Sequence, residues 1–400
     1  MTLSSRNGAF ESFLNPENAL KKILTTAVLA SVAGAAQAQS SVTLYGLIDA
    51  GISYNSHIKN ATGGSSSYWG YGDGVAQGSR WGLRGTEDLG GGLQAIFVLE
   101  NGFSSGTGAA GQGGTLFGRQ AYVGLTQNTI GSLTFGRQYS FSTDYLGGYY
   151  SNGGNTAVGN WAYHFNDIDQ LTSSRINNSV KFSSVNFSGL TFGGLYGFSN
   201  TTSFAGAPTT SAEASSRTYS FGANYAYGPF GLGAAYTNIT YPGAASPAFT
   251  TTISGIGGAL QDLRTFGVGG RYTLGPATVW ALWTNTLLSQ IASSSYLYNA
   301  YEAGARYAFT PALSGQLGYT YSRASGLFGA HWNQIDAAVD YLLSKRTDVY
   351  LAVAYQDASG SYKGAPVQAQ IGDSNSSIFQ PSGSGSQDQL AVHVGMRVKF

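Results

Sequence analysis

The chain of 400 residues contains no cysteine and only four histidines. Without cysteine there is no disulfide framework, and there is no thiolate to act as a nucleophile or as a metal ligand. The histidines His57, His164, His331 and His393 are scattered, and none has a second ligand type at a useful spacing. We therefore expect neither a metal site nor a cofactor.

Charged residues are also scarce, at 10% of the chain, whereas a soluble domain averages about 25%. Glycine is abundant instead, with 58 residues, which disfavours a helix-rich architecture. Beyond residue 38 no apolar run reaches the roughly 18 residues that a membrane-spanning helix needs. If the chain crosses a membrane, it must do so as a closed barrel. The net charge is only +1, and no nucleic-acid partner is expected.

The N-terminus is typical of a secreted protein. A basic pair at 21–22 precedes an apolar stretch that ends in the cleavage pattern Ala-Gln-Ala, which predicts a signal peptide at 20–38. Residues 1–19 are polar and unlike the start of a signal peptide, and we interpret them as an N-terminal extension from a start codon assigned too early. Residues 39–400 then form a single domain.

The C-terminal stretch 390–400 alternates between apolar residues and small or polar ones. One face carries Leu390, Val392, Val394, Met396, Val398 and Phe400. The other face carries Ala391, His393, Gly395, Arg397 and Lys399. This period of two predicts a β-strand with one apolar and one hydrated face.

Similar runs recur along the chain, bounded by clusters of glycine, proline, serine and asparagine. They number 16, an even number, as a bacterial barrel of one chain requires. The runs lie at about 42–54, 79–88, 93–103, 115–127, 131–141, 175–187, 190–199, 217–228, 230–240, 263–274, 277–288, 299–310, 312–324, 332–344, 347–358 and 388–400. Short links alternate with long polar ones, of which 142–174 and 359–387 are the longest. We predict an all-β transmembrane antiparallel barrel of about 16 strands, with short periplasmic turns and long extracellular loops.

One run departs from the alternation. In Ala277–Leu288, the residues Trp280, Leu282 and Trp283 place large apolar side chains on both faces. A β-bulge and a contact between protomers are both open as explanations.

Four motifs carry a resemblance to a known family. They are Ser-Val-Thr-Leu-Tyr-Gly-Leu-Ile-Asp at 41–49, Arg-Trp-Gly-Leu-Arg-Gly-Thr-Glu-Asp-Leu-Gly at 80–90, Phe-Gly-Arg-Gln at 117–120 and 135–138, and Arg-Ile-Asn-Asn-Ser-Val-Lys-Phe at 175–182. With the terminal Phe400, they resemble the general diffusion porins of β-proteobacteria such as Burkholderia, Bordetella and Neisseria. The resemblance covers essentially all of 39–400.

The resemblance implies a 16-stranded barrel that assembles as a homotrimer in the outer membrane of a Gram-negative bacterium. It implies four kinds of further partner: outer-membrane lipid and lipopolysaccharide, the barrel-assembly machinery that reads Phe400, small hydrophilic solutes, and ions. It also implies that the third loop, 142–174, folds into the lumen and narrows the pore. The chain lacks the acidic Pro-Glu-Phe-Gly-Gly motif of the enteric branch, and this loop offers only Asp144, Asp167 and Asp169 as acids.

A pore selects ions through charged groups at its narrowest level, where the low-dielectric wall focuses their field. Strand parity points Arg80, Arg84, Arg175 and Lys181 into the lumen. Parity places Arg137 on the lipid face, unless bulges at the preceding glycines turn Arg119 and Arg137 inward. The resemblance implies that Arg80, Arg137 and Arg175 form the basic wall of the constriction. We predict the constriction from Arg80, Arg84, Arg119, Arg137, Arg175, Asp144, Asp167 and Asp169, and further pore lining from Asp49, Lys181, Arg271 and Arg306.

These features favour a water-filled channel for passive diffusion of small hydrophilic solutes and ions, with a weak preference for anions. The main alternative is a channel specific for anions or sugars. A structural or adhesive barrel with a closed lumen is a third possibility. We expect no enzymatic activity, because His164 with Asp167 and Asp169 does not by itself form a catalytic constellation.

Overall fold

The computed structural model describes residues 41–62, 64–164, 167–172, 174–198, 217–240, 260–290, 295–326, 329–362, 364–372 and 383–400. The extension proposed at 1–19 and the signal peptide proposed at 20–38 lie outside the described residues. The long links at 199–216 and 241–259 lie outside them as well.

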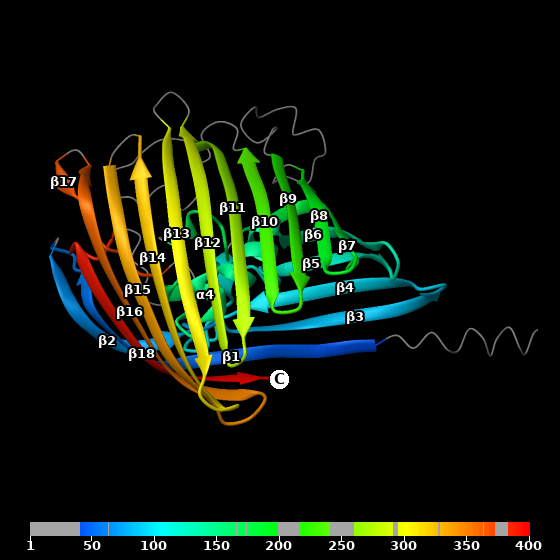
Figure 1. Cartoon of the computed structure of the whole chain (residues 1–400), viewed down its shortest axis with the longest axis horizontal. Helices are drawn as coiled ribbons and strands as arrows, with labels where there is room; N and C mark the ends of the chain where they lie inside the picture. The colour runs from blue at the N-terminus through cyan, green and yellow to red at the C-terminus, as the bar shows by residue number, and fades with distance from the viewer. Residues whose placement is uncertain are drawn as a thin grey trace, which may run out of the picture.

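The described chain is dominated by antiparallel strands (Figure 1). The strands of the barrel are β1 (Ser41–Lys59), β3 (Arg80–Gly90), β4 (Leu93–Gly102), β5 (Gln120–Gln127), β6 (Gly131–Tyr139), β7 (Arg175–Ser184), β8 (Leu190–Gly197), β9 (Arg217–Tyr227), β10 (Phe230–Thr240), β11 (Leu260–Leu274), β12 (Ala277–Gln290), β13 (Tyr296–Ala308), β14 (Leu313–Ser325), β15 (Gly329–Leu342), β16 (Thr347–Tyr362) and β18 (Asp388–Lys399). Each of the 16 predicted runs overlaps one of these strands.

The barrel is closed by its first and last strands. β1 pairs with β18, with Ile48 opposite Val398 and Ile52 opposite Val394, and on its other side β1 pairs with β3. Every other barrel strand pairs with its neighbours in chain order, and β16 pairs with β18. The prediction of a closed antiparallel barrel of 16 strands is confirmed.

Two short strands were not predicted from the sequence. β2 (Ser65–Asp73) lies in what was read as a loop, and it pairs with the second half of β1, from Ala50 to Lys59. Between β2 and β3 the chain turns inward, where the backbone N–H of Gln77 donates to the Asp49 carboxylate at 2.7 Å. β17 (Ala365–Pro366) adds a single hairpin to the end of β16. Both strands are rich in small and polar residues, so neither shows an apolar period.

Burial along each strand is the reverse of that in a soluble protein. On β15, Ile335 has half of its surface exposed, whereas its neighbours Gln334 and Asp336 are buried. The same alternation runs through β1 and β18, where Ile52 and Val394 point outward and Asp49 and His393 point inward. An apolar outer face and a polar inner face are what a strand needs between lipid and a hydrated lumen.

The third loop folds into the barrel, as predicted. It contains the short helical turns η2 (Ser142–Gly147), α3 (Gly148–Tyr150), α4 (Asn152–Asn155) and η3 (Gly159–Trp161), whereas α2 (Gly111–Gly114) lies in the loop before β5. Figure 1 shows α4 inside the ring of strands. Among the described residues, no helix is long and apolar enough to cross a membrane.

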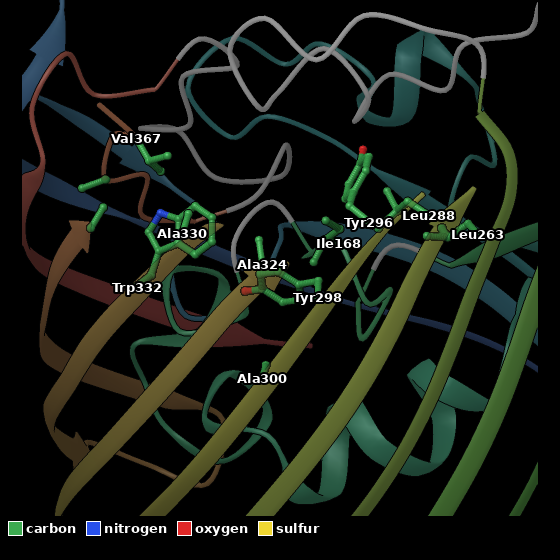
Figure 2. Close-up of a cluster of buried hydrophobic side chains, with 12 residues drawn as sticks. Ile168, Leu263, Leu288, Tyr296, Tyr298, Ala300, Ala324, Ala330, Trp332 and Val367 are labelled. Atoms are coloured by element: carbon green, nitrogen blue, oxygen red, sulfur yellow. The ribbon is translucent and has the colours of Figure 1, made fainter. Parts of the chain in front are cut away.

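The loop is held by apolar contacts with one side of the inner wall. Val158 and Trp161 pack against a surface of inward-facing alanines on β15, β16 and β18. Nearer the mouth, Ile168 joins a cluster that includes Tyr298 and Trp332 (Figure 2). Small residues on the inner wall leave the volume that the loop fills.

The loop also explains the irregular run 277–288. β12 pairs with β13 without a register shift, so no bulge interrupts this pairing. Trp280 and Leu282 face inward, whereas Trp283 faces outward. Leu282 packs with Leu146 and Tyr150 of the loop. The large inward side chains are therefore a docking surface for the loop.

Replacing Ile335 with arginine tests the lipid-facing assignment. A charged side chain on the lipid face of a barrel strand costs roughly 2–4 kcal/mol at the membrane midplane. We expect Ile335→Arg to unfold at lower urea concentration in phospholipid vesicles, whereas Ile335→Leu unfolds like the parent protein. Equal unfolding midpoints for the arginine variant and the parent would place Ile335 outside the apolar zone.

Candidate functional site

A cavity of about 850 Å³ lies between the inward loop and the wall formed by β1, β3 to β7 and the end of β18. The loop side contributes Thr143, Asp144, Tyr163 and Thr172, among others. The wall side contributes Tyr45, Arg80, Glu100, Arg119, Tyr139 and Arg175. The loop packs against the inner wall on the side of β12 to β18, and the cavity lies on the arginine-bearing side.

Three of the predicted arginines line this cavity. Arg80 and Arg175 are the first residues of β3 and β7, and Arg119 directly precedes β5. The Arg175 guanidinium lies 5.2 Å from the centre of the Tyr139 ring, and its Nε donates to the Tyr139 hydroxyl at 3.2 Å. Stacking on an aromatic ring fixes a guanidinium without neutralising its charge.

Glu100 is a site residue that the sequence reasoning missed. It is buried on β4, accepts from Arg119 Nε at 2.7 Å, and accepts from the Tyr45 hydroxyl at 3.0 Å. The run 93–103 is apolar on both faces before Glu100, so parity gave no clear inward set there. Glu100 is the only acidic residue in the run 93–103, and this was the one feature of the sequence that could have indicated it as a site residue.

Of the three acids predicted at the constriction, Asp144 alone lines the cavity. It forms an ion pair with Lys181, which also donates to the backbone carbonyl of Tyr139 at 2.8 Å. Asp167 and Asp169 differ from the expectation, because both are buried within the loop and do not face the arginines. Asp167 accepts from the backbone N–H of Thr172 at 3.0 Å.

Arg137 is not among the residues that line the cavity. The register with β5 continues through Gly136, so Arg137 stays on the face of Phe135, and the irregularity lies on the β7 side. Its Nε donates to the carbonyl of Gly118 at 2.8 Å, and its guanidinium also bonds Asn177. The bulge that was expected to turn Arg137 inward therefore does not bring it to the cavity.

The remaining predicted residues occupy other levels of the lumen. Arg84 is exposed beside the Tyr45 ring, 5.4 Å from its centre, and Arg306 is exposed on β13. Arg271 lies 5.6 Å from the centre of the Tyr149 ring, on the far side of the loop. Asp49 is fully buried and accepts from the Tyr350 hydroxyl at 2.6 Å, so it braces the inward turn before β3 and does not line the cavity.

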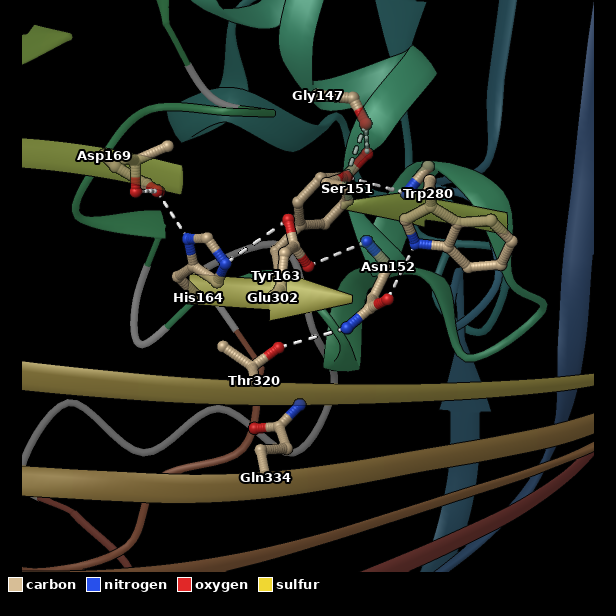
Figure 3. A network of polar contacts seen from close by, with 12 residues as sticks. Gly147, Ser151, Asn152, Tyr163, His164, Asp169, Trp280, Glu302, Thr320 and Gln334 are labelled. Carbon is tan, nitrogen blue, oxygen red and sulfur yellow. Dashed lines mark hydrogen bonds and ion pairs between the residues drawn. The ribbon is translucent and has the colours of Figure 1, made fainter. Parts of the chain in front are cut away.

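A buried polar network ties the loop to the wall (Figure 3). The backbone N–H of Asn152 donates to Glu302 of β13 at 2.8 Å, and its side chain bonds Trp280 at 2.8 Å and Thr320 at 3.1 Å. These three partners come from β13, β12 and β14. The loop is thus fixed at α4 by hydrogen bonds from three adjacent strands.

His164 forms the second half of this network. Its Nδ1 lies 2.5 Å from Asp169 Oδ2, and its Nε2 lies 3.4 Å from Glu302 Oε1. Burial alone would lower the pKa of His164, but the two carboxylates outweigh it and raise this pKa well above the usual range. The two carboxylates thus favour the protonated imidazole, which joins the loop acid to the wall acid.

The site offers a passage with fixed cations on its wall. Arg80 and Arg175 have no carboxylate partner among the described residues, whereas Arg119 is paired with Glu100 and Lys181 with Asp144. Within the described ranges, no three His, Asp or Glu side chains are grouped so as to hold a metal ion. The cations left unpaired give the passage a positive field.

Comparison with known proteins gives a family and relatives. A family model described as Gram-negative porin matches residues 25–361. An outer membrane porin protein of Bordetella pertussis is 39% identical over 231 residues, which is 55% of this chain and 59% of that protein. The chain thus spans less than two thirds of the length of this relative.

Solved structures share the fold. An anion-selective porin from Comamonas acidovorans superposes with a TM-score of 0.69 at 26% identity, covering 90% of this chain and 100% of that one. The trimer form of OmpT, an outer membrane protein of Vibrio cholerae, gives a TM-score of 0.61 at 17% identity, with coverage of 90% and 99%. The second similarity shows the fold alone.

Truncating Glu302 tests the anchoring network. Glu302→Ala leaves the Asn152 N–H and the His164 imidazole without their buried partner, and breaking a buried ion pair costs about 3–5 kcal/mol. We expect a lower unfolding midpoint in urea and new protease cleavage within 140–174. The control is Glu87→Ala, which removes the same charge from an exposed position on β3. If the two variants unfold alike and resist protease alike, Glu302 does not anchor the loop.

Proposed function

Because the chain belongs to the Gram-negative porin family, we propose that it forms a water-filled channel through which small hydrophilic solutes and ions diffuse passively, with a weak preference for anions. The protein is a multi-pass barrel of the Gram-negative outer membrane. The observation that carries the proposal is the cavity of about 850 Å³ beside the loop, which is lined by three arginines.

The preference for anions follows from the balance of charge around the cavity. Glu100 pairs with Arg119 and Asp144 pairs with Lys181, so the charges left over in the lining are the cations Arg80, Arg175 and Lys399 and the single acid Asp73. A low-dielectric wall raises the local concentration of counter-ions around such charges. The anion-selective porin from Comamonas acidovorans, with which this chain shares 26% identity, supports the same assignment.

The constriction is proposed to consist of Arg80, Arg119 and Arg175 with Glu100 and Asp144. Arg84, Arg271 and Arg306 are proposed to act in the wider vestibule, where the field of each is more strongly screened. Arg137 is proposed to affect the constriction indirectly, by fixing the position of β7. Asp167 and Asp169 are proposed to affect it indirectly, by fixing the conformation of the loop. Asp49 is proposed to fix the inward turn at 74–79.

A homotrimer is proposed as the assembled form. The family fold and the trimer form of the Vibrio cholerae neighbour support this state, although that neighbour is similar in fold alone. The barrel-assembly machinery is a further proposed partner, with Phe400 as the residue it reads. Phe400 pairs with Gly46 through two backbone hydrogen bonds of 3.0 Å, so it also completes the junction between the first and last strands.

A channel specific for particular anions or sugars is the second candidate. Tyr45, Tyr139 and Tyr163 line the cavity beside the arginines, and such a mixture of rings and cations can bind a solute. The two functions differ in how solute flux depends on solute concentration. Flux through a channel with a binding site reaches a maximum, whereas flux through a diffusion pore rises in proportion to concentration.

Ion selectivity tests the charge assignment. We expect the zero-current potential in a KCl gradient to show anion preference at low salt, and this preference fades as the Debye length shrinks from about 10 Å at 0.1 M to about 3 Å at 1 M. Arg175→Ala should weaken the preference, and Glu100→Gln should strengthen it by releasing Arg119. Arg217→Ala on the exposed end of β9 is the control. Cation preference in the parent protein, or unchanged selectivity in Arg175→Ala, contradicts the assignment.

Single-channel conductance tests general diffusion against a specific site. The diffusion model predicts that conductance rises in proportion to KCl activity and that neutral solutes reduce it only according to their size. The measurement is a planar-bilayer recording with graded concentrations of salt, dicarboxylates and sugars. Saturation of the conductance, or block by one solute at low concentration, would favour the specific channel.

Removal of Phe400 tests its role in assembly. We expect the truncated chain to reach the outer membrane in lower amounts, as measured by the fraction of folded barrel in outer-membrane extracts. Phe400→Tyr retains the ring and the backbone bonds to Gly46 and should assemble normally. If truncation leaves the folded fraction unchanged, the terminal residue carries no assembly signal.

A further inference from the structure

The apolar part of the cavity lining is mainly aromatic. Beside its charged and polar residues, the cavity of about 850 Å³ is lined by five aromatic rings and by only three aliphatic side chains. The rings are those of Tyr45, Phe103, Tyr139, Tyr163 and Phe400, and the aliphatic side chains are those of Leu47, Ala76 and Leu171. Selection of ions by charge needs no aromatic surface, so the rings require a separate explanation.

On the wall side, one ring and one guanidinium form a fixed pair. Tyr139 and Arg175 are directly opposite each other on β6 and β7, so the backbone holds their side chains on the same face of the sheet. The Arg175 guanidinium lies 5.2 Å from the centre of the Tyr139 ring, and its Nε donates to the Tyr139 hydroxyl at 3.2 Å. The wall therefore presents an apolar ring and a cation side by side.

The guanidinium of Arg175 keeps one edge available for a solute. Its Nε is used by Tyr139, whereas its two terminal nitrogens donate no hydrogen bond to any residue that the structure describes. A carboxylate can accept two parallel N–H bonds from such an edge. The nearby acids do not compete for it, because Glu100 is paired with Arg119 and Asp144 with Lys181.

The remaining charges of the lining favour an anionic solute. Asp73 is the one acid of the lining without a basic partner among the described residues, and its carboxylate accepts from the Ser105 hydroxyl at 2.6 Å and from the Ser79 hydroxyl at 3.2 Å. Arg80 and Lys399 add two cations to that of Arg175. The charges outside the two ion pairs therefore sum to a positive value.

On the loop side, Tyr163 supplies a second ring. Its hydroxyl donates to the carbonyl of Gly147 at 3.5 Å, and Figure 3 shows it among the residues that fix the loop. Gly153 lies directly against this ring, since a Cβ at Gly153 would come within 2.6 Å of Cδ2 and within 2.7 Å of Cε2. The ring is thus held in place, and because Tyr163 lines the cavity and is half-buried, part of it remains accessible to a solute.

Glycines leave room beside the rings. The loop contributes Gly148, Gly153 and Gly154 to the lining, and the inward turn before β3 contributes Gly78. A Cβ at Gly148 would meet no atom within 4 Å, and a Cβ at Gly78 would meet only Arg119 Nη1, at 3.7 Å. Because no side chain projects from these positions, the cavity can accept a flat molecule between the loop and the wall.

We propose that the cavity contains a binding site for aromatic carboxylates. The carboxylate of the solute pairs with the Arg175 guanidinium, and its ring packs against Tyr139 and Tyr163 in the offset or edge-on arrangements that aromatic rings prefer. The site is weak and exchanges rapidly, so it adds a preference among anions to a pore that still conducts other solutes by diffusion. This inference rests on the proposed function, because only an open passage with a positive field delivers such a solute to the site.

Block of the single-channel current by two carboxylic acids tests the proposal. Benzoate and cyclohexanecarboxylate carry the same charge at neutral pH and are similar in size, but only benzoate has an aromatic ring. The full-length protein is recorded in planar bilayers in 0.1 M KCl, where the Debye length is about 10 Å. We expect benzoate to reach half-block at a concentration about fivefold lower than cyclohexanecarboxylate, which corresponds to about 1 kcal/mol for the aromatic contacts.

The variants use the ratio of these two half-blocking concentrations, because changes in charge or pore width that affect both acids alike cancel in it. Tyr163→Leu and Tyr139→Leu each remove one ring and should bring the ratio close to one, whereas Tyr163→Phe should retain it. The control is Tyr149→Leu, which removes a ring beside Arg271 outside the cavity and should leave the ratio unchanged. Arg175→Ala should weaken block by both acids. Folding of each variant is checked by its unfolding midpoint in urea.

Two kinds of failure can be distinguished. Equal block by the two acids in the parent protein, no block by benzoate, or an unchanged ratio in both leucine variants overturns the aromatic site, although the anion preference in KCl and the proposed pore would stand. A parent protein that does not conduct, or that prefers cations in KCl, contradicts the proposed pore and overturns the site together with it.

Discussion

The structure depends on one constraint, which is that no backbone N–H or C=O group can remain without a hydrogen-bond partner inside a membrane. The pairing of β1 with β18 meets it by closing the ring, with Asp49 opposite Arg397 and Ile52 opposite Val394. Closure forces each strand to separate lipid from lumen, and this produces the outward apolar and inward polar parity. A ring of this many strands is too wide to be filled by its own side chains, so it leaves space inside.

That space is divided unequally, and the division creates the site. The loop 142–174 fills the side of the lumen where the wall is lined with alanines and carries Trp280 and Leu282, and Glu302 and His164 fix it there. The opposite side stays open and carries Arg80, Arg119 and Arg175. The loop therefore contributes mainly volume, whereas the wall supplies the charge, including the acid Glu100.

The sequence predicted the fold well because the membrane imposes a period of two on every strand. It predicted Arg80 and Arg175 in the lumen for the same reason. Glu100 was missed because its run is apolar on both faces, and β2 was missed because small polar residues show no period. Asp167 and Asp169 could not be placed, since a loop without regular structure has no parity. Arg137 follows strict parity and stays on the face of Phe135, so the prediction that a bulge turns it inward to the constriction was wrong.

The central claim is that the open passage runs between the loop and the arginine-bearing wall and has a positive field. A cysteine at Gln77, which lines the cavity, is the most direct probe, since the chain contains no other cysteine. The account predicts that an anionic methanethiosulfonate reagent modifies Gln77→Cys faster than a cationic one and lowers the single-channel conductance. Ala338→Cys, buried beneath the loop, should remain unmodified. Faster modification by the cationic reagent, or modification of Gln77→Cys without loss of conductance, would contradict the account.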